Sequence, residues 1–172
     1  FRIQRNMAIQ PSYSKERFER EYARFNPNCE PFNIKNLEVI KSRDVEDFND
    51  GECAGAIKVF FRYKKQYDLF EFPNLPLELN QIIHGFNTHF IEFSVKIVYP
   101  NDYPFRHPFW YLDTFHTNKD NSEHIKEFFD YKLNVHRDTI KPHLWSPAGM
   151  TIEKDVLSFF VKINFFEDII NC

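Results

Sequence analysis

Two segments of the chain alternate strictly between apolar and polar residues, which is the pattern of a half-buried β-strand. Residues 90–99 carry apolar side chains at every second position: Ile91, Phe93, Val95, Ile97 and Tyr99. Residues 56–63 repeat the pattern with Ile57, Val59, Phe61 and Tyr63. Both segments therefore predict strands that turn one face toward a core.

Helical spacing of apolar residues predicts a helix near each end of the chain. In residues 14–25, Phe18, Tyr22 and Phe25 share one face, and Ser14 suits the N-cap. Thr151 suits the N-cap of a second helix, from Ile152 to about Phe166. Because that helix is apolar nearly all round, we expect it to be buried on several sides.

Weaker signals fill the rest of the chain. They predict short strands at 37–40 and 109–112 and short helices at 77–84, closed by Gly85, and after Ser122. Residues 113–121 are polar, which predicts a loop. The resulting fold class is α+β: an antiparallel meander sheet with the N-terminal helix before it and the C-terminal helix packed on it.

Two motifs add a family resemblance to this pattern. The predicted strand at 90–99 runs into a proline-rich turn, Tyr-Pro-Asn-Asp-Tyr-Pro-Phe-Arg-His-Pro, at residues 99–108. Downstream, residues 145–148 read Trp-Ser-Pro-Ala and lead into the last helix. In this order and setting, the motifs resemble the ubiquitin-conjugating (E2) domain. The resemblance covers residues 88–168 well and the earlier part loosely.

The resemblance implies a division of the chain. Residues 1–13 would form an N-terminal arm, and residues 14–172 a single E2-like domain. Relative to the family, that domain would carry insertions near 64–87 and 113–135.

The chain departs from the family at the catalytic position. Active E2 enzymes carry a nucleophilic cysteine shortly before the Trp-Ser-Pro-Ala segment, and here residues 133–144 contain none. The matching position falls near Arg137, and His116-Thr-Asn118 and Asn134 only weakly match the family's His-Pro-Asn motif. Thioester chemistry needs a thiolate that attacks and leaves readily. The sequence therefore predicts an E2-like fold without enzyme activity.

In E2-like proteins the proline turn and the Ser-Pro-Ala loop lie close together and bind partner proteins. The resemblance therefore implies a partner-binding site at Pro104, Phe105, Pro108, Ser146, Pro147 and Ala148. The alternative is purely architectural, because prolines fix turns whether or not anything binds there. Trp145 is expected in the core beneath this region.

Composition excludes several other functions. The balance of 22 basic and 25 acidic residues gives a net charge of −3, so no overall field favours nucleic acid or an anionic membrane. Cys29, Cys53 and Cys172 fit neither a disulfide framework nor a Cys-x-x-Cys zinc site. The histidines form no zinc-hydrolase motif, and the glycines form no phosphate-binding loop. We expect no metal, no cofactor and no membrane span.

Aromatic residues make up 18% of the chain, more than one small core usually needs, so we expect some at protein interfaces. The leading hypothesis is an inactive E2-like accessory subunit of a larger assembly. The basic first 20 residues, without an initial Met, would suit a mitochondrial complex such as one of the respiratory chain. An alternative is a cytoplasmic or nuclear E2 variant that pairs with an active E2. A third is an enzyme that uses Cys53.

Overall fold

The computed structural model describes residues 11–32, 35–44, 52–66, 75–86, 88–140 and 144–162. The helices are α1 (Pro11–Arg24), α2 (Leu77–Phe86), α3 (Ser122–Thr139) and α4 (Ile152–Lys162), with a short 3₁₀ turn, η1, at Glu30–Phe32. The strands are β1 (Leu37–Arg43), β2 (Gly55–Gln66), β3 (Thr88–Tyr99) and β4 (Phe109–Thr117). They form one antiparallel sheet in the order β1-β2-β3-β4, which confirms the predicted α+β meander.

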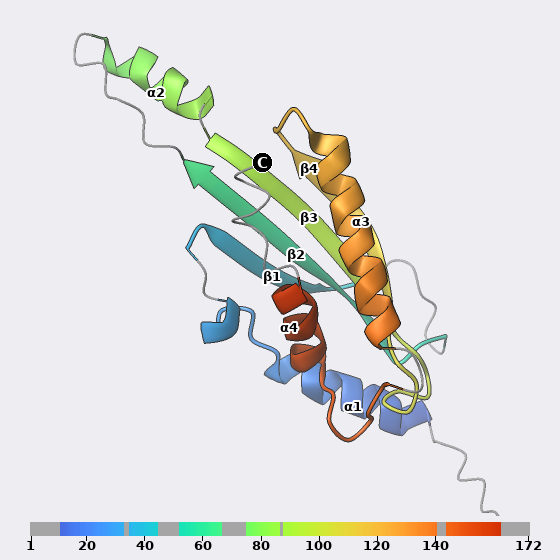
Figure 1. Cartoon of the computed structure of the whole chain (residues 1–172). Coiled ribbons are helices and arrows are strands. Elements are labelled where there is room, and N and C mark those ends of the chain that lie inside the picture. The colour runs from blue at the N-terminus through green and yellow to red at the C-terminus, as the bar shows by residue number, and fades with distance from the viewer. Residues whose placement is uncertain are drawn as a thin grey trace, which may run out of the picture.

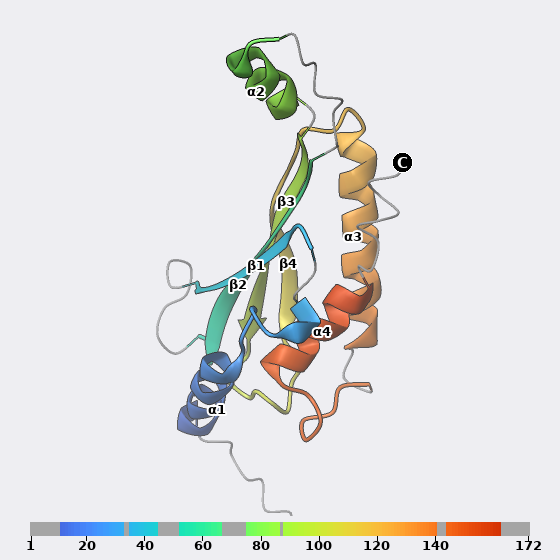
Figure 2. The same cartoon turned by 90° about the vertical axis from the view of Figure 1, so that its left-hand side faces the viewer.

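Helices α3 and α4 cover one face of the sheet, and α1 lies across its end (Figures 1 and 2). The alternation predicted for the two long strands is confirmed, because every inward side chain is buried: Ile57, Val59, Phe61, Tyr63, Ile91, Phe93, Val95, Ile97 and Tyr99. Between the sheet and the helices lies a largely aromatic core. Phe93, for example, contacts Phe61 on β2 and Phe129 on α3, with ring centroids 4.7 and 4.3 Å away.

Helix α1 begins earlier than predicted. It starts at Pro11, a residue favoured in the first helical turn, so Ser14 is a buried interior residue and not the N-cap. Its apolar stripe is as expected, with Phe18 and Phe25 buried. Phe18 packs against Tyr99 and leaves room only for a hydrogen at Gly55, where an added Cβ would lie 2.2 Å from the ring.

Several other boundaries differ from prediction. Strand β1 continues to Arg43, and α2 passes through Gly85 to Phe86. Residues 113–117, predicted as loop, extend β4. The helix at Ser122 has 18 residues, and its N-cap is Asn121, without a side-chain capping bond. The N-cap at Thr151 fits, since its Oγ1 accepts the amide of Lys154 at 3.2 Å.

Some predictions fall outside the described residues. These are the arm as far as residue 10, the segment 67–74, the last helix beyond Lys162, and Cys172.

Candidate partner-binding site

The proline turn after β3 places successive aromatic residues on opposite sides. Its backbone is fixed by hydrogen bonds from the amide of Tyr103 to the carbonyl of Pro100 (2.9 Å) and from that of Phe105 to Asp102 (2.8 Å). Tyr103 is fully buried, whereas Phe105 is 58% exposed. The turn therefore anchors itself in the core through Tyr103 and presents Phe105 outward.

The second motif docks directly on this turn. Trp145 is buried, as predicted, and its Nε1 donates to the carbonyl oxygen of Pro104 at 2.6 Å. Its ring also lies 6.4 Å from that of Tyr103. Beyond it, the amides of Gly149 and Met150 both donate to the carbonyl of Ser146, which closes a tight turn. The two motifs, joined by a hydrogen bond between residues 41 apart in sequence, thus form one surface.

Helix α1 holds both motifs through Glu21, which is 6% exposed. Its carboxylate accepts from the hydroxyl of Tyr103 (2.5 Å), from the first amide of α4 at Ile152 (3.1 Å) and from Arg17 Nε. Arg17 Nη2 donates to the carbonyls of Pro147 (3.3 Å) and Met150 (3.4 Å). Burial, and then the hydrogen bond to Glu21, raise the pKa of Tyr103 far above its ordinary value. The loops are therefore rigidly connected to the domain.

The six predicted site residues divide into two groups. Phe105, Ser146 and Ala148 are exposed and Pro147 is half-buried, so these four are available to a partner. Pro104 and Pro108 are buried and support the turns from within. Leu144, missed by the sequence reasoning, is 59% exposed and adjoins Trp145. We call the surface made by Phe105, Leu144, Ser146, Pro147 and Ala148 the loop face.

Arg137, near which the resemblance places the family's cysteine position, lies on α3 and serves a structural role. Arg137 donates Nε and Nη2 to the carbonyl oxygen of Trp110 on β4, at 2.8 and 2.6 Å, and Nη1 to Asn134 Oδ1 at 2.9 Å. β4 is an edge strand of the sheet, and the guanidinium satisfies one of its outward carbonyls. Asn118, from the other weak match, accepts the amide of Phe90 at 3.0 Å.

A buried polar cluster secures α3. Asp155 on α4 accepts from Trp110 Nε1 at 2.9 Å and from His136 Nε2 at 3.1 Å. Asp155 and His136 are 0% exposed and Trp110 is 1% exposed, so no substrate reaches the His–Asp pair. The cluster joins α3, α4 and β4, and sequence reasoning missed it. The available signal was an acid, Asp155, on the apolar side of α4 beside Ile152 and Val156.

In the part of the chain that the structure describes, the cysteines and the possible metal ligands show little sign of chemical activity. Cys29 and Cys53 are half-buried free thiols, and burial raises the pKa of Cys53, which disfavours the nucleophilic thiolate. Within the described ranges, no three His, Cys, Asp or Glu side chains are grouped so that they could hold a metal ion. Among the helices described, none is both long and apolar enough to cross a membrane.

Helix α2 was predicted, but its exposure was not. It lies beyond the ends of β2 and β3, away from the other helices (Figures 1 and 2). Leu77, Leu79 and Ile82 are 70, 46 and 54% exposed. A helix of 10 residues is marginal alone in water, so this apolar surface is a second candidate contact.

Comparisons with known proteins add no family: no protein-family model, no curated protein and no solved structure matches the chain.

Proposed function

We propose that the chain is a non-catalytic, E2-like accessory subunit that binds other proteins of a larger assembly. One observation supports the proposal: the two loops that the resemblance compares with the partner-binding loops of E2-like proteins contact each other and expose Phe105, Ser146 and Ala148. The position that the resemblance compares with the family's cysteine lies on a helix. Arg137, near that position, donates two hydrogen bonds to the carbonyl oxygen of Trp110. A scaffold needs exposed binding loops and has no use for a nucleophile.

The order of elements supports the E2-like part of the proposal. An N-terminal helix precedes a four-stranded meander, and the proline turn follows the third strand. The Trp-Ser-Pro-Ala segment then leads into a helix that packs on the sheet. Helix α2 lies within the segment 64–87, where the resemblance predicts an insertion, and α3 begins in the second such segment, 113–135, and extends beyond it to Thr139. α2 and the loop face would then contact different neighbours.

Exposed apolar side chains support the binding part. Phe105 and Leu144 on the loop face are each more than half exposed, as are Leu77 and Ile82 on α2. Aromatic side chains are enriched at protein interfaces, so Phe105 is the main candidate anchor. A mitochondrial assembly such as a respiratory-chain complex is the concrete candidate.

The binding proposal is tested by replacing Phe105 with serine and comparing native-size fractionation of the variant and the wild type. Tyr131→Ser is the matched control, because Tyr131 is an aromatic residue 62% exposed on α3 and belongs to neither surface. We expect Phe105→Ser to shift the protein out of the large fraction and Tyr131→Ser to leave it there. Equal migration of both variants, and of the α2 variant Ile82→Ser, would refute the role of these surfaces.

The absence of catalysis is tested separately by ubiquitin loading. With the activating enzyme, ATP and ubiquitin, we expect no adduct that thiol reagents release. A releasable adduct that disappears in Cys53→Ser would overturn the proposal in favour of an enzyme that uses that thiol.

The second candidate is an E2 variant that pairs with an active E2 and positions ubiquitin. The exposed loop face favours it, since Phe105 and the Ser146–Ala148 turn are accessible without rearrangement. It predicts a small one-to-one complex with an active E2, which the same fractionation would detect.

A further inference from the structure

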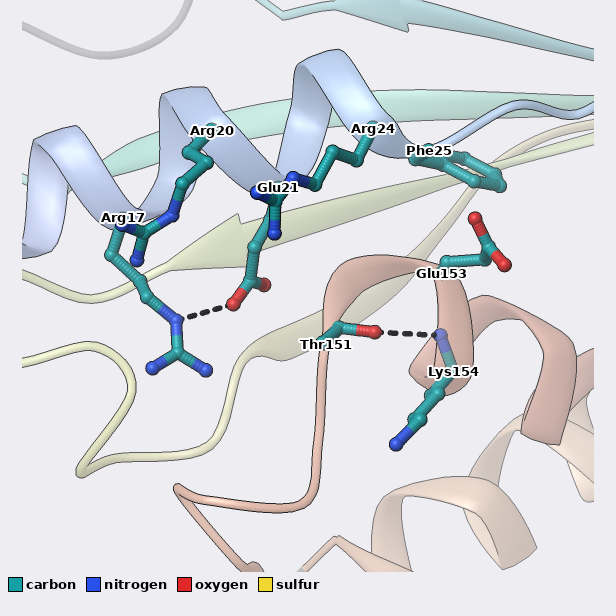
Figure 3. Close-up of a pocket in the computed structure, with 8 residues that line it drawn as sticks. All are labelled: Arg17, Arg20, Glu21, Arg24, Phe25, Thr151, Glu153 and Lys154. Carbon is teal, nitrogen blue, oxygen red and sulfur yellow. Dashed lines mark hydrogen bonds and ion pairs between the residues drawn. The ribbon is translucent and has the colours of Figure 1, made fainter.

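Basic side chains make up half of the lining of a concave pocket beside the loop face. It has a volume of about 350 Å³ and lies between α1 and the start of α4 (Figure 3). Its lining residues are Arg17, Arg20, Glu21, Arg24, Phe25, Thr151, Glu153 and Lys154. Four of these are cationic and two are anionic, so the lining carries a net charge of +2. This local charge opposes the overall negative charge of the chain.

Among the residues that the structure describes, three of the four cations of the lining have no ionic partner. Arg17 pairs with Glu21, so these two charges cancel. Arg20 and Arg24 are exposed, and neither has a hydrogen-bonding or ionic partner among the residues that the structure describes. Lys154 Nζ donates only to a neutral group, the carbonyl of Gly149, at 3.1 Å. Glu153 is the carboxylate of the lining that opposes these three cations.

The spacing of the two free arginines fits a ligand shared between them. Arg20 and Arg24 are four residues apart on α1, so they lie on the same side of the helix, where like charges repel each other. An anion between them would remove this repulsion. A guanidinium presents its N–H groups as a planar fork that matches two phosphate oxygens at once.

The N-terminus of α4 does not itself form the anion site. Its first amide, at Ile152, is already bonded to Glu21, and that of Lys154 to Thr151. Binding would therefore depend on the side chains of Arg20, Arg24 and Lys154. This makes the site testable by substitution without disturbing the cap of α4.

We infer that this pocket binds a dianionic phosphate monoester through Arg20, Arg24 and Lys154. The net charge of the lining matches the charge of the ligand. The phosphate is either that of a phosphorylated side chain on a protein or that of a small soluble phosphate. The inference goes beyond the proposed function and does not depend on it, because the pocket excludes every residue of the loop face.

The test uses the full chain and titration calorimetry with three probes: inorganic phosphate, a short phosphoserine peptide and the same peptide unphosphorylated. We expect the phosphopeptide to bind at least about tenfold more tightly than its unphosphorylated form, because each charge-assisted bond contributes on this order. Binding should weaken as salt is raised. Phosphate and phosphopeptide of equal affinity would indicate a small-molecule ligand, and a tighter phosphopeptide would indicate a protein.

Variants make the inference falsifiable. Arg20→Gln with Arg24→Gln should weaken phosphopeptide binding by about tenfold or more. Lys35→Gln with Lys126→Gln removes the same charge from exposed positions outside the pocket and should leave affinity nearly unchanged. Glu153→Gln, which removes the opposing carboxylate, should strengthen binding. Equal loss in both double variants, or equal affinity for the two peptides, would overturn the inference.

Discussion

Substitution of Asp155 by alanine should destabilise the domain severely, because the side chain joins three elements in a dry environment. Asp155 on α4 is 0% exposed and accepts hydrogen bonds from Trp110 on β4 and His136 on α3. Its removal leaves two buried donors without an acceptor. Each unsatisfied buried group costs about 1–3 kcal/mol, and breaking a buried charged cluster costs about 3–5 kcal/mol.

We therefore expect Asp155→Ala to lower the free energy of unfolding by about 3–5 kcal/mol, a large part of the roughly 5–15 kcal/mol typical of a domain. Asp155→Asn keeps the shape and one acceptor oxygen, so its loss should be smaller, about 1–2 kcal/mol. Urea denaturation followed by circular dichroism measures both. Asp130→Ala is the control, because Asp130 is exposed on α3 and should change stability by less than about 0.5 kcal/mol.

The reasoning also predicts non-additivity. If Trp110 and Asp155 act through one hydrogen bond, the double variant Trp110→Phe with Asp155→Ala should be less destabilised than the sum of the single variants. A loss below about 1 kcal/mol for Asp155→Ala, or strict additivity in this cycle, would show that the cluster does not hold α3 in place.

Three further predictions concern the anchoring of the two motifs. Glu21→Ala leaves the donors of Arg17, Tyr103 and Ile152 unpaired, so it should lower the free energy of unfolding by about 3 kcal/mol or more in urea denaturation. Glu16→Ala, at an exposed position, should lower it little. Equal effects of the two substitutions would contradict the anchoring role. Burial raises the pKa of Tyr103 and Tyr99. Above about pH 10, therefore, only the unfolded chain loses these protons. The free energy of unfolding keeps its full value below that pH and should fall above it by about 1.4 kcal/mol per pH unit for each tyrosine. Tyr103→Phe should reduce that slope, and an unchanged slope would exclude its contribution. Gly55→Ala forces a methyl group against Phe18 and should lower the free energy of unfolding by about 1–3 kcal/mol. Gly149→Ala should be nearly neutral, because the nearest atom to its added methyl group lies 3.4 Å away. Similar losses at both sites would refute the packing argument.

Local patterns predicted the sheet well. In β2 and β3, side chains alternate between core and solvent, so period-two spacing alone identifies the strands and their inner faces. The ends of elements were harder to predict, because capping depends on neighbours in space. Ser14 has the chemistry of an N-cap, but Pro11 also suits the start of a helix, and α1 begins at Pro11.

The length of α3 illustrates a different difficulty. Its buried residues, Ile125, Phe129, Leu133 and His136, follow helical spacing, so the pattern was present in the sequence. The family resemblance directed attention to an active-site segment at this position instead. His136 also looks polar in the sequence, and its burial is intelligible only with Asp155 beside it.

The site was predictable only in part. The two motifs identified the loops, but the burial of Pro104 involves Trp145, whose bond to it spans 41 residues. The basic pocket joins residues of α1 to residues at the start of α4, and no local pattern relates such distant segments. The exposure of α2 depends on what the rest of the chain leaves uncovered.

The most direct test of the central proposal is native-size fractionation of the endogenous protein, with mass spectrometry of the proteins that migrate with it. An accessory subunit should migrate with a large assembly at a fixed stoichiometry, and the fraction would identify that assembly. Migration as a free monomer would contradict the proposal. A small one-to-one complex with an active E2 would replace it with the ubiquitin-pathway alternative.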